Sequence, residues 1–294
     1  DLIFFNAPYE ISLLTNKINF VIMLLSMQHR TCNYFPEYQK GHDYEIRDYI
    51  IENAVKKSFK IFVGAERDKS LLVKFFNAVE DKIIVQPYSF TLPKLYEQNP
   101  DYDYKKTFEN LDLQSEKKLF IYPAQFWAHK NHRLIVDSLA CLRESGNKEV
   151  YAVFCGSDCG NLPTILKMAK QKGVDDLVKY VGFVPDDQMP AYYKNSLALV
   201  MPSYFGPTNM PPLEAFAMKT PVVVSSDKPL ISSKYSGYLS CNNFVTSPPS
   251  SRIKLGFQPS GPLTVCSIHH QNSSSVSPFH AKTGIFLSAI AEAA

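Results

Sequence analysis

The chain has 294 residues, of which 45% are hydrophobic and 13% aromatic, so it holds enough apolar side chains for two domains with sizeable cores. Its formal net charge of +3 is too small to predict nucleic-acid binding. The longest apolar run near the start, residues 18–25, is too short to span a bilayer, and the first residues have no signal-peptide pattern.

Residues 1–92 alternate between strand and helix patterns. We predict strands at 18–25, 59–64 and 82–85, and helices at 43–58 and 65–77. This order predicts a parallel sheet covered by helices on both faces. Because the pattern starts abruptly, we expect a partial Rossmann-like domain whose first strands lie before Asp1.

Residues 93–116 are polar and rich in turn-forming residues, which predicts a linker. A second alternation fills residues 117–230, where we expect a second, incomplete Rossmann-like domain. Its predicted strands are 119–122, 150–155, 177–183, 197–201 and 221–226, and its predicted helices are 131–145, 162–172, 187–195 and one that starts near Pro211. Two consecutive domains of this kind form a cleft, which is a preferred place for ligands.

Residues 231–294 carry few charges and are rich in Ser and Pro, so we expect a loosely ordered tail there. The fold class is therefore α/β, with two truncated parallel-sheet domains and an irregular C-terminal tail. The six cysteines show no pair with zinc-site spacing, which predicts no metal site. Free thiols are typical of a reducing compartment, and we expect a cytoplasmic protein.

One segment with candidate chemistry is YPAQFWAHKNH, residues 122–132, at the end of a predicted strand and the start of a predicted helix. In an open α/β sheet, ligands bind at that end of the strands. Lys130 there would place an ammonium group beside free backbone N–H groups, which suits a diphosphate without a metal ion. The alternative is a solvated Lys130 beside a Trp127 that only packs.

The other segment runs from Ser203 to Met218 and predicts a loop followed by a helix. Pro211 and Pro212 suit the first turn of a helix, where a missing N–H costs nothing. We expect Glu214 in that first turn, where its carboxylate can accept hydrogen bonds from the two hydroxyls of a ribose. Alternatively, Glu214 only complements the helix dipole.

Together the two segments resemble the retaining glycosyltransferases of GT-B fold, known as family 4 or group 1. The resemblance covers residues 120–228 well and residues 1–92 in part. Its motifs are the YPAQFW-x-HKNH run, the Cys155-Gly156-Ser157 turn, YVGFVP at 180–185, and GPTN-x-PPLEA, which ends at Ala215.

The resemblance implies that these motifs bind the donor, a nucleotide-diphosphate sugar. Lys130 would contact the diphosphate, and Glu214 would hold the ribose as the second glutamate of the family's E-x7-E signature. The loop of Thr208, Asn209 and Met210 would face the sugar and the phosphates through its backbone. In addition, Gly156 would allow close approach of the nucleotide.

Two positions depart from the family pattern. Gly206 stands where the first glutamate of E-x7-E is expected, and Gln125 replaces an arginine that often lies five residues before the lysine. The first glutamate usually touches the donor sugar, so the choice of sugar stays open. Gln125 remains a donor-binding candidate.

In the N-terminal half, Ser26-Met27-Gln28-His29-Arg30 follows a predicted strand and resembles the family's loop with a histidine that faces the donor sugar. His29 is therefore the catalytic candidate, with its Nε2–H donating to a sugar hydroxyl near the reacting carbon. The alternative is a structural histidine at a strand end. Arg30 and Glu37 are expected to pair locally or stay solvated.

The function implied is transfer of a sugar to an acceptor hydroxyl with retention, without metal or any cofactor besides the nucleotide-sugar co-substrate. The acceptor would be a saccharide or another hydroxyl compound; no nucleic acid and no transmembrane span are expected, and peripheral membrane contact stays open. The alternative is an inactive glycosyltransferase-like fragment or a nucleotide-sugar-binding protein. A dehydrogenase is disfavoured because no G-x-G-x-x-G follows a first strand.

Overall fold

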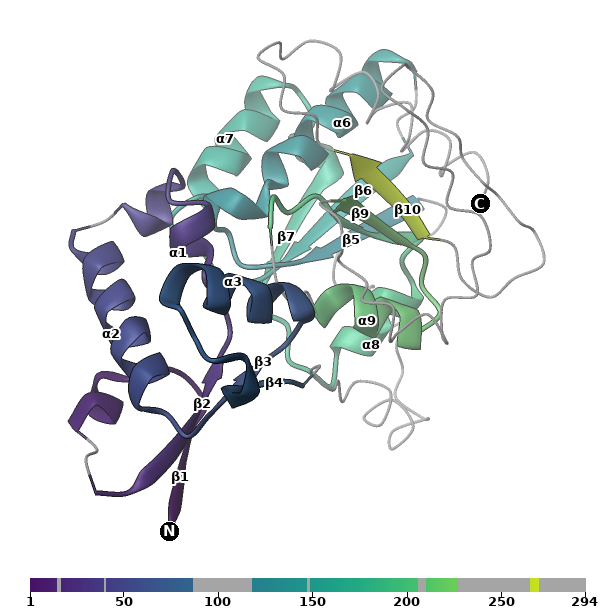
Figure 1. Ribbon diagram of the computed structural model, residues 1–294. Helices are drawn as coiled ribbons and strands as arrows, with labels where there is room; N and C mark the ends of the chain where they lie inside the picture. Colours follow the sequence, from purple (N-terminus) through teal and green to yellow (C-terminus); the bar gives the residue numbers. More distant parts are fainter. Residues whose placement is uncertain are drawn as a thin grey trace. The chain divides into compact units, whose positions relative to one another are not determined.

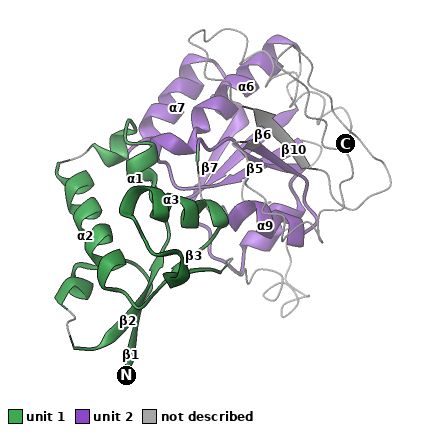
Figure 2. Ribbon diagram, in the orientation of Figure 1, with its two compact units in different colours: residues 1–89, 205–209 green, residues 90–204, 210–294 purple. Residues whose placement is uncertain are grey.

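The computed structural model describes residues 1–14, 17–39, 41–86, 118–146, 149–205, 210–226 and 265–269. The chain divides into two compact units, of which unit 1 comprises residues 1–89 and 205–209, and unit 2 comprises residues 90–204 and 210–294 (Figure 2). The expected linker at 93–116 lies outside the described residues.

The described part of unit 1 is a parallel sheet with strand order β1-β2-β3-β4 (Figure 1). Its elements are β1 (Leu2–Phe5), η1 (Glu10–Leu14), β2 (Asn19–Leu24), α1 (Gln28–Thr31), η2 (Pro36–Tyr38), α2 (Asp43–Lys57), β3 (Lys60–Val63), α3 (Glu66–Phe76), η3 (Glu80–Lys82) and β4 (Ile83–Val85). All the elements predicted between residues 18 and 85 are present, with ends that differ by at most one residue. The edge strand β1 was not predicted.

One face of this sheet forms the core of unit 1. Ile22 of β2 and Ile61 of β3 are paired in register and buried, together with Ile51 and Val55 of α2 and Leu72 of α3. Both described long helices therefore cover the same face. This follows from the strand order, because successive right-handed crossovers that add each strand on the same side keep every helix on one face.

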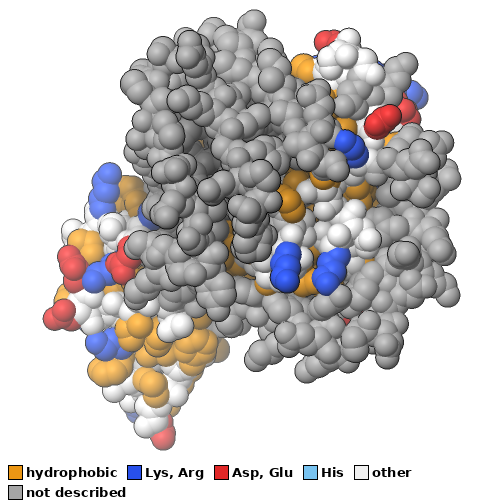
Figure 3. All heavy atoms as spheres, turned by 90° about the vertical axis from the view of Figure 1, so that its right-hand side faces the viewer, with side chains coloured by type: hydrophobic (Ala, Val, Ile, Leu, Met, Phe, Trp, Pro, Cys, Tyr) orange, Lys and Arg blue, Asp and Glu red, His pale blue; other side chains and the backbone are white. Residues whose placement is uncertain are grey.

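The expectation of helices on both faces is thus wrong for the described part of unit 1. The opposite face carries Leu2 and Phe4, which are 58% and 54% exposed, and Ile84, which is 36% exposed. Phe4 contacts Phe62 edge-on, with 6.2 Å between ring centroids. Figure 3 shows hydrophobic side chains gathered on the described surface of unit 1.

The described part of unit 2 is a parallel sheet with strand order β10-β9-β8-β5-β6-β7. Its elements are β5 (Lys118–Pro123), η4 (Ala128–Lys130), α6 (His132–Glu144), β6 (Val150–Cys155), α7 (Leu162–Gln171), η5 (Asp175–Leu177), β7 (Val178–Gly182), α8 (Met189–Lys194), β8 (Ala198–Met201), α9 (Met210–Ala217), β9 (Val222–Ser226) and β10 (Val265–His269). All nine elements predicted between residues 117 and 230 are present. β10 pairs with β9 within the segment expected to be a loosely ordered tail.

Unit 2 has helices on both faces of its sheet, α6 and α7 on one and α8 and α9 on the other (Figure 1). The central strands are accordingly buried along their whole length, as the six residues of β6 and the four of β8 show. Buried on both sides, such strands have continuous apolar sequences rather than alternating ones. That property made them recognisable from the sequence.

Candidate functional site

The strand order of unit 2 reverses between β5 and β8. The chain leaves β5 to add β6 and then β7 on one side, and it returns to the other side of β5 for β8 and β9. Loops that leave β5 and β8 therefore diverge, and in open α/β sheets ligands bind at the carboxyl ends of the strands at such a switch point. The two candidate segments of the sequence follow these two strands.

Main-chain atoms join the two loops. The Tyr204 N–H donates to the His129 carbonyl across 2.9 Å, and the Ser203 hydroxyl approaches the same carbonyl at 3.4 Å. From the other loop, the Asn131 side-chain amide donates to the Pro202 carbonyl across 3.1 Å. The residues on either side of Lys130 are thus anchored to the segment that follows β8.

The backbone around Lys130 is held in a fixed path. Its carbonyl accepts a hydrogen bond of 2.7 Å from the hydroxyl of Tyr122, a fully buried residue of β5. Asn131 then adopts a left-handed conformation with φ of 57°, and α6 begins at His132. The half-buried Lys130 therefore lies at the entrance of a 13-residue helix, whose first N–H groups have no intrahelical partners.

Glu214 lies in the second turn of α9 rather than in the first. The helix begins at Met210, so Pro211 and Pro212 occupy the first turn as expected, and Glu214 is its fifth residue. The difference arises because Met210 is already helical. Glu214 therefore lies one turn away from the free N–H groups, and dipole complementation at the helix N-terminus does not account for its presence.

Instead, Glu214 is held by Tyr193 of the neighbouring helix α8. The Tyr193 hydroxyl donates to Glu214 Oε2 across 2.7 Å, and the Tyr193 side chain is fully buried. The Tyr193 carbonyl accepts a second bond of 2.7 Å from the hydroxyl of Thr220, just beyond the end of α9. One residue of α8 thus fixes both the carboxylate and the far end of α9.

Burial raises the pKa of Glu214 above its usual value, the hydrogen bond from Tyr193 opposes that shift, and the charge of Asp186 adds to it. Burial also raises the pKa of Tyr193 well above its usual value, so this residue is a hydrogen-bond donor at neutral pH. Among the described residues Glu214 Oε1 accepts no hydrogen bond. The carboxylate therefore has one fixed oxygen and one available to a ligand hydroxyl.

Gly156 packs against the backbone of the loop after β5. Its φ is +137°, and a Cβ there would lie 2.4 Å from the Ala124 carbonyl oxygen. The Gly156 N–H donates to the Gly182 carbonyl, at 2.7 Å, and its own carbonyl accepts from the Tyr180 hydroxyl. The close approach that requires glycine is therefore made by the protein's own backbone.

The exposed Gln125 accepts a hydrogen bond from the Trp127 indole at 2.9 Å.

His132, the last residue of the 122–132 segment, is a buried histidine for which no role was predicted. His132 is fully buried and stacks on Phe126, with 4.1 Å between ring centroids and 13° between planes. Neither ring nitrogen has a hydrogen-bond partner of standard geometry in the described part of the chain. Burial lowers the pKa of His132 to about 3, so the ring is neutral at physiological pH.

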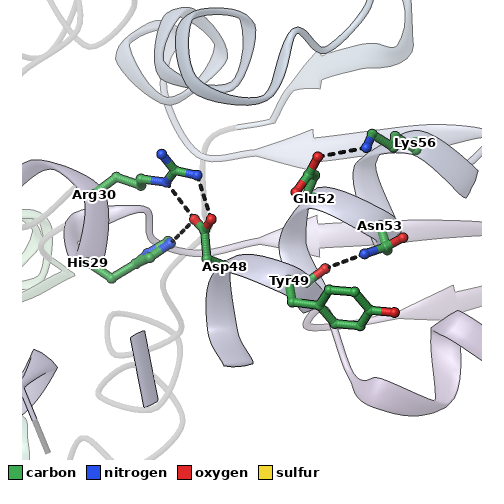
Figure 4. A network of polar contacts seen from close by, with 7 residues as sticks. All are labelled: His29, Arg30, Asp48, Tyr49, Glu52, Asn53 and Lys56. Carbon is green, nitrogen blue, oxygen red and sulfur yellow. Dashed lines mark hydrogen bonds and ion pairs between the residues drawn. The ribbon is translucent and has the colours of Figure 1, made fainter. Parts of the chain in front are cut away.

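In unit 1, His29 belongs to a buried polar cluster (Figure 4). Its side chain is 1% exposed, and Nε2 lies 3.2 Å from Asp48 Oδ1. Arg30 binds both oxygens of the same carboxylate, which confirms its expected local pairing. Nε2 is thus engaged by Asp48, and a sugar hydroxyl would have to meet Nδ1, which has no partner among the described residues. Burial lowers the pKa of His29.

Within the described ranges, no group of three His, Cys, Asp or Glu side chains could hold a metal ion. The same ranges contain no helix that is both long and apolar enough to cross a membrane.

Residues 103–240 match the sequence model of the family described as "Glycosyl transferases group 1". Through this segment, the chain resembles the group 1 glycosyltransferases. An uncharacterised glycosyltransferase of Methanocaldococcus jannaschii is 28% identical over 172 residues, which are 58% of this chain and 43% of that protein. A mannosylfructose-phosphate synthase of Agrobacterium fabrum is 24% identical over 164 residues, 50% of this chain and 36% of that one. The chain spans less than half the length of these relatives.

Solved glycosyltransferase structures show the same GT-B fold. WaaG, a glycosyltransferase involved in lipopolysaccharide biosynthesis, superposes with a TM-score of 0.69 at 14% identity, over 99% of this chain and 68% of that one. HepE of Anabaena, in complex with UDP-glucose, superposes with a TM-score of 0.60 at 17% identity, over 77% and 60% of the two chains. The predicted resemblance to these glycosyltransferases and the predicted fold class are therefore confirmed.

The candidate site is partly assembled in the described residues. The residues found on the loops and on α9 at the switch-point side of unit 2 are Gln125, Lys130, Gly156, Met210 and Glu214. Thr208 and Asn209 lie outside the described residues. Tyr193 was not predicted, because nothing in the sequence distinguishes it from Tyr192 beside it. The roles of all these residues in binding stay predictions.

Proposed function

We propose that the protein transfers a sugar from a nucleotide-diphosphate donor to an acceptor hydroxyl, with retention and without a metal ion. The observation that carries this proposal is the junction of two loops at the switch point, where His129 and Asn131, on either side of Lys130, are bonded to Pro202 and Tyr204. A cation and a polar acceptor on neighbouring loops suit a diphosphate and a ribose.

In this proposal each side chain has a distinct role. The ammonium group of Lys130 neutralises charge that develops on the diphosphate as it leaves, together with helix N–H groups. Glu214 accepts hydrogen bonds from the ribose hydroxyls, with Oε2 oriented by Tyr193. Thr208, Asn209 and Met210 face the sugar and phosphates through their backbone, as in the family. The acceptor attacks from the face that the diphosphate leaves, and the leaving phosphate takes its proton.

In the proposal, His29 contacts the donor sugar through Nδ1 rather than through the predicted Nε2. Asp48 engages Nε2, so the neutral ring presents Nδ1 as a hydrogen-bond acceptor. A donor-sugar hydroxyl would then donate to His29. Because the Asp48 carboxylate that contacts His29 is itself held by Arg30, the ring orientation is fixed before the substrate binds.

The relatives' names support the donor class. One solved relative holds UDP-glucose, and several curated relatives are named mannosyltransferases or synthases of sugar phosphates. In this chain Gly206 replaces the glutamate that usually touches the sugar. We also propose a cytoplasmic location, and Cys32, Cys141, Cys155 and Cys159 are free thiols.

A second candidate function is nucleotide-sugar binding without transfer. It is favoured by Gly206, which stands where the family's first glutamate is expected. Measured hydrolysis or transfer from a panel of nucleotide sugars separates the two. Turnover supports transfer, and binding without any turnover supports the second candidate. Addition of a chelator to an active sample tests metal independence.

The binding site itself is tested by calorimetry with UDP, GDP and ADP. Lys130→Ala and Glu214→Ala should each weaken nucleotide binding by roughly tenfold or more, because each removes a charged side chain that would contact the nucleotide. Lys167→Ala is a matched control, because Lys167 is an exposed cation on α7 of the same unit. Unchanged binding in both test variants would remove the assignment.

A further inference from the structure

Asn131 combines an uncommon backbone conformation with a buried side chain. Three described residues other than glycine have a positive φ, namely Asn77, Asn131 and Lys219, and of these three Asn131 is the buried one, at 7% exposure. Its φ of 57° is a left-handed conformation that glycine adopts freely and asparagine tolerates. Since glycine would meet the backbone requirement equally well, the contribution particular to asparagine is its side-chain amide.

That amide is turned away from the helix which Asn131 begins. The Asn131 carbonyl accepts the Leu134 N–H at 3.0 Å, so Asn131 is the N-cap residue of α6. An asparagine at this position ordinarily accepts a helix N–H with its side-chain oxygen. Here the side chain makes no such cap bond, and its amide nitrogen donates to the Pro202 carbonyl at 3.1 Å. The side chain is therefore used to hold the loop after β8 rather than the end of its own helix.

Two strands of the sheet thereby hold the backbone at Lys130. From β5, the buried Tyr122 donates its hydroxyl to the Lys130 carbonyl at 2.7 Å. From the end of β8, the Pro202 carbonyl holds the very next residue, Asn131. A lysine side chain is a flexible four-carbon stem, so the space that its ammonium group samples depends on how firmly its backbone is placed. The bond between Asn131 and Pro202 is thus one of the contacts that restrict where the ammonium group can lie.

We propose that Asn131 is a positioning residue, whose amide bond to Pro202 places the Lys130 ammonium group at the diphosphate of the nucleotide. This inference rests on the proposed function and adds to it the residue that arranges the cation. Asn131 acts through Lys130 and requires no contact of its own with the ligand. Loss of the amide should therefore weaken the contact with the diphosphate and leave the contacts with the base and the ribose unchanged.

Asn131→Gly tests the amide alone, because glycine keeps the left-handed backbone and adds no cap to α6. Calorimetry uses whichever of UDP, GDP and ADP the unchanged protein binds most tightly, together with the nucleoside that has the same base. The variant should bind the nucleotide roughly fivefold more weakly, as expected for one lost hydrogen bond, and the nucleoside equally well. Asn77→Gly is the matched control, because Asn77 is an exposed asparagine of unit 1 with a φ of 49°.

A double-mutant cycle with Lys130→Ala shows whether Asn131 acts through the lysine. Once residue 130 is alanine, Asn131→Gly should cause no further loss of nucleotide affinity. An equal loss with and without the lysine would overturn the positioning role, because the exchange would then act on the loops as a whole. Equal losses for the nucleotide and the nucleoside would overturn it for the same reason.

The outcomes also separate this inference from the proposal on which it rests. Unchanged nucleotide binding by Asn131→Gly, with binding by Lys130→Ala still weakened, would overturn the role of Asn131 alone. Failure of the unchanged protein to bind any of the three nucleotides would overturn both proposals.

Discussion

The hydroxyl of Tyr193 lies 2.7 Å from Glu214 Oε2 and donates to it from inside the core of unit 2. A buried donor on a buried side chain fixes a half-buried carboxylate more firmly than a solvent-exposed partner would, because water does not compete for the bond. The orientation of Glu214 is therefore set by α8, and the candidate ribose-binding group is prepared before a ligand arrives.

Tyr193→Phe tests this orientation. The variant keeps the ring and the carbonyl that accepts from Thr220, so α8 and α9 should stay packed. Without the hydroxyl, Glu214 loses one hydrogen bond worth about 1 kcal/mol, and nucleotide affinity should fall roughly fivefold. Calorimetry with UDP and ADP measures the change. Thr220→Val is the control that loosens α9 without touching the carboxylate, and equal affinity losses in both variants would contradict an orienting role.

Nucleotide binding should weaken in mildly acidic solution. The pKa of Glu214 is raised by burial, so the carboxylate takes up a proton at a higher pH than an exposed glutamate does. The protonated group is a poorer acceptor for ribose hydroxyls, so affinity should decrease as pH falls through this raised pKa. The diphosphate also titrates, and the ratio of the affinities of the unchanged protein and Glu214→Gln removes that contribution. A ratio that is constant from pH 8 to pH 5 would contradict the prediction.

Acid should also destabilise the fold through His132. Its pKa is about 3 in the folded protein and 6.5 as its reference value, so below pH 6.5 the unfolded chain binds a proton that the folded protein does not. Stability therefore falls as pH falls, by about 2 kcal/mol between pH 7 and pH 5. His132→Phe retains an aromatic ring against Phe126 and should lack this component. Urea unfolding of both proteins at the two pH values checks the difference, and parallel losses would show that other groups are responsible.

Gly156→Ala should destabilise unit 2 by about 2–4 kcal/mol, because a Cβ would lie 2.4 Å from the Ala124 oxygen and the backbone φ is unfavourable as well. Gly160→Ala is the matched control. Gly160 also has a positive φ, of +100°, but nothing lies within 4 Å of its Cβ position. The difference between the two variants in thermal or urea unfolding isolates the clash. Similar losses would mean that backbone strain alone accounts for both.

The fold was largely predictable because the strands of unit 2 are buried on both faces. Val150–Cys155 and the run that contains β8 are continuous apolar segments between helical patterns, so both strands and their parallel order follow from the sequence. The four residues of β1 were missed because a short apolar run with no flanking pattern has no periodicity to assess. The location of both described long helices of unit 1 on one face of its sheet was missed because strand order, rather than element type, decides which face a helix covers.

The site was predictable only in part. Lys130 and Glu214 could be proposed because their segments follow strands, and parallel strands end at one edge. The contacts that hold them could not, because the partners are far apart in the sequence. Tyr193 precedes Glu214 by 21 residues, and His129 precedes Tyr204 by 75. The location of Glu214 in the second turn depended on where α9 begins, and helix ends are poorly defined by sequence.

The junction around Lys130 has a consequence for how this chain can change over many generations. The bond between Tyr204 and His129 uses the N–H of one residue and the carbonyl of the other, and Asn131 is held by the carbonyl of Pro202. Such bonds persist whatever side chains stand at positions 129 and 204. Mutation can therefore alter the chemical character of these two positions while the loops keep their path.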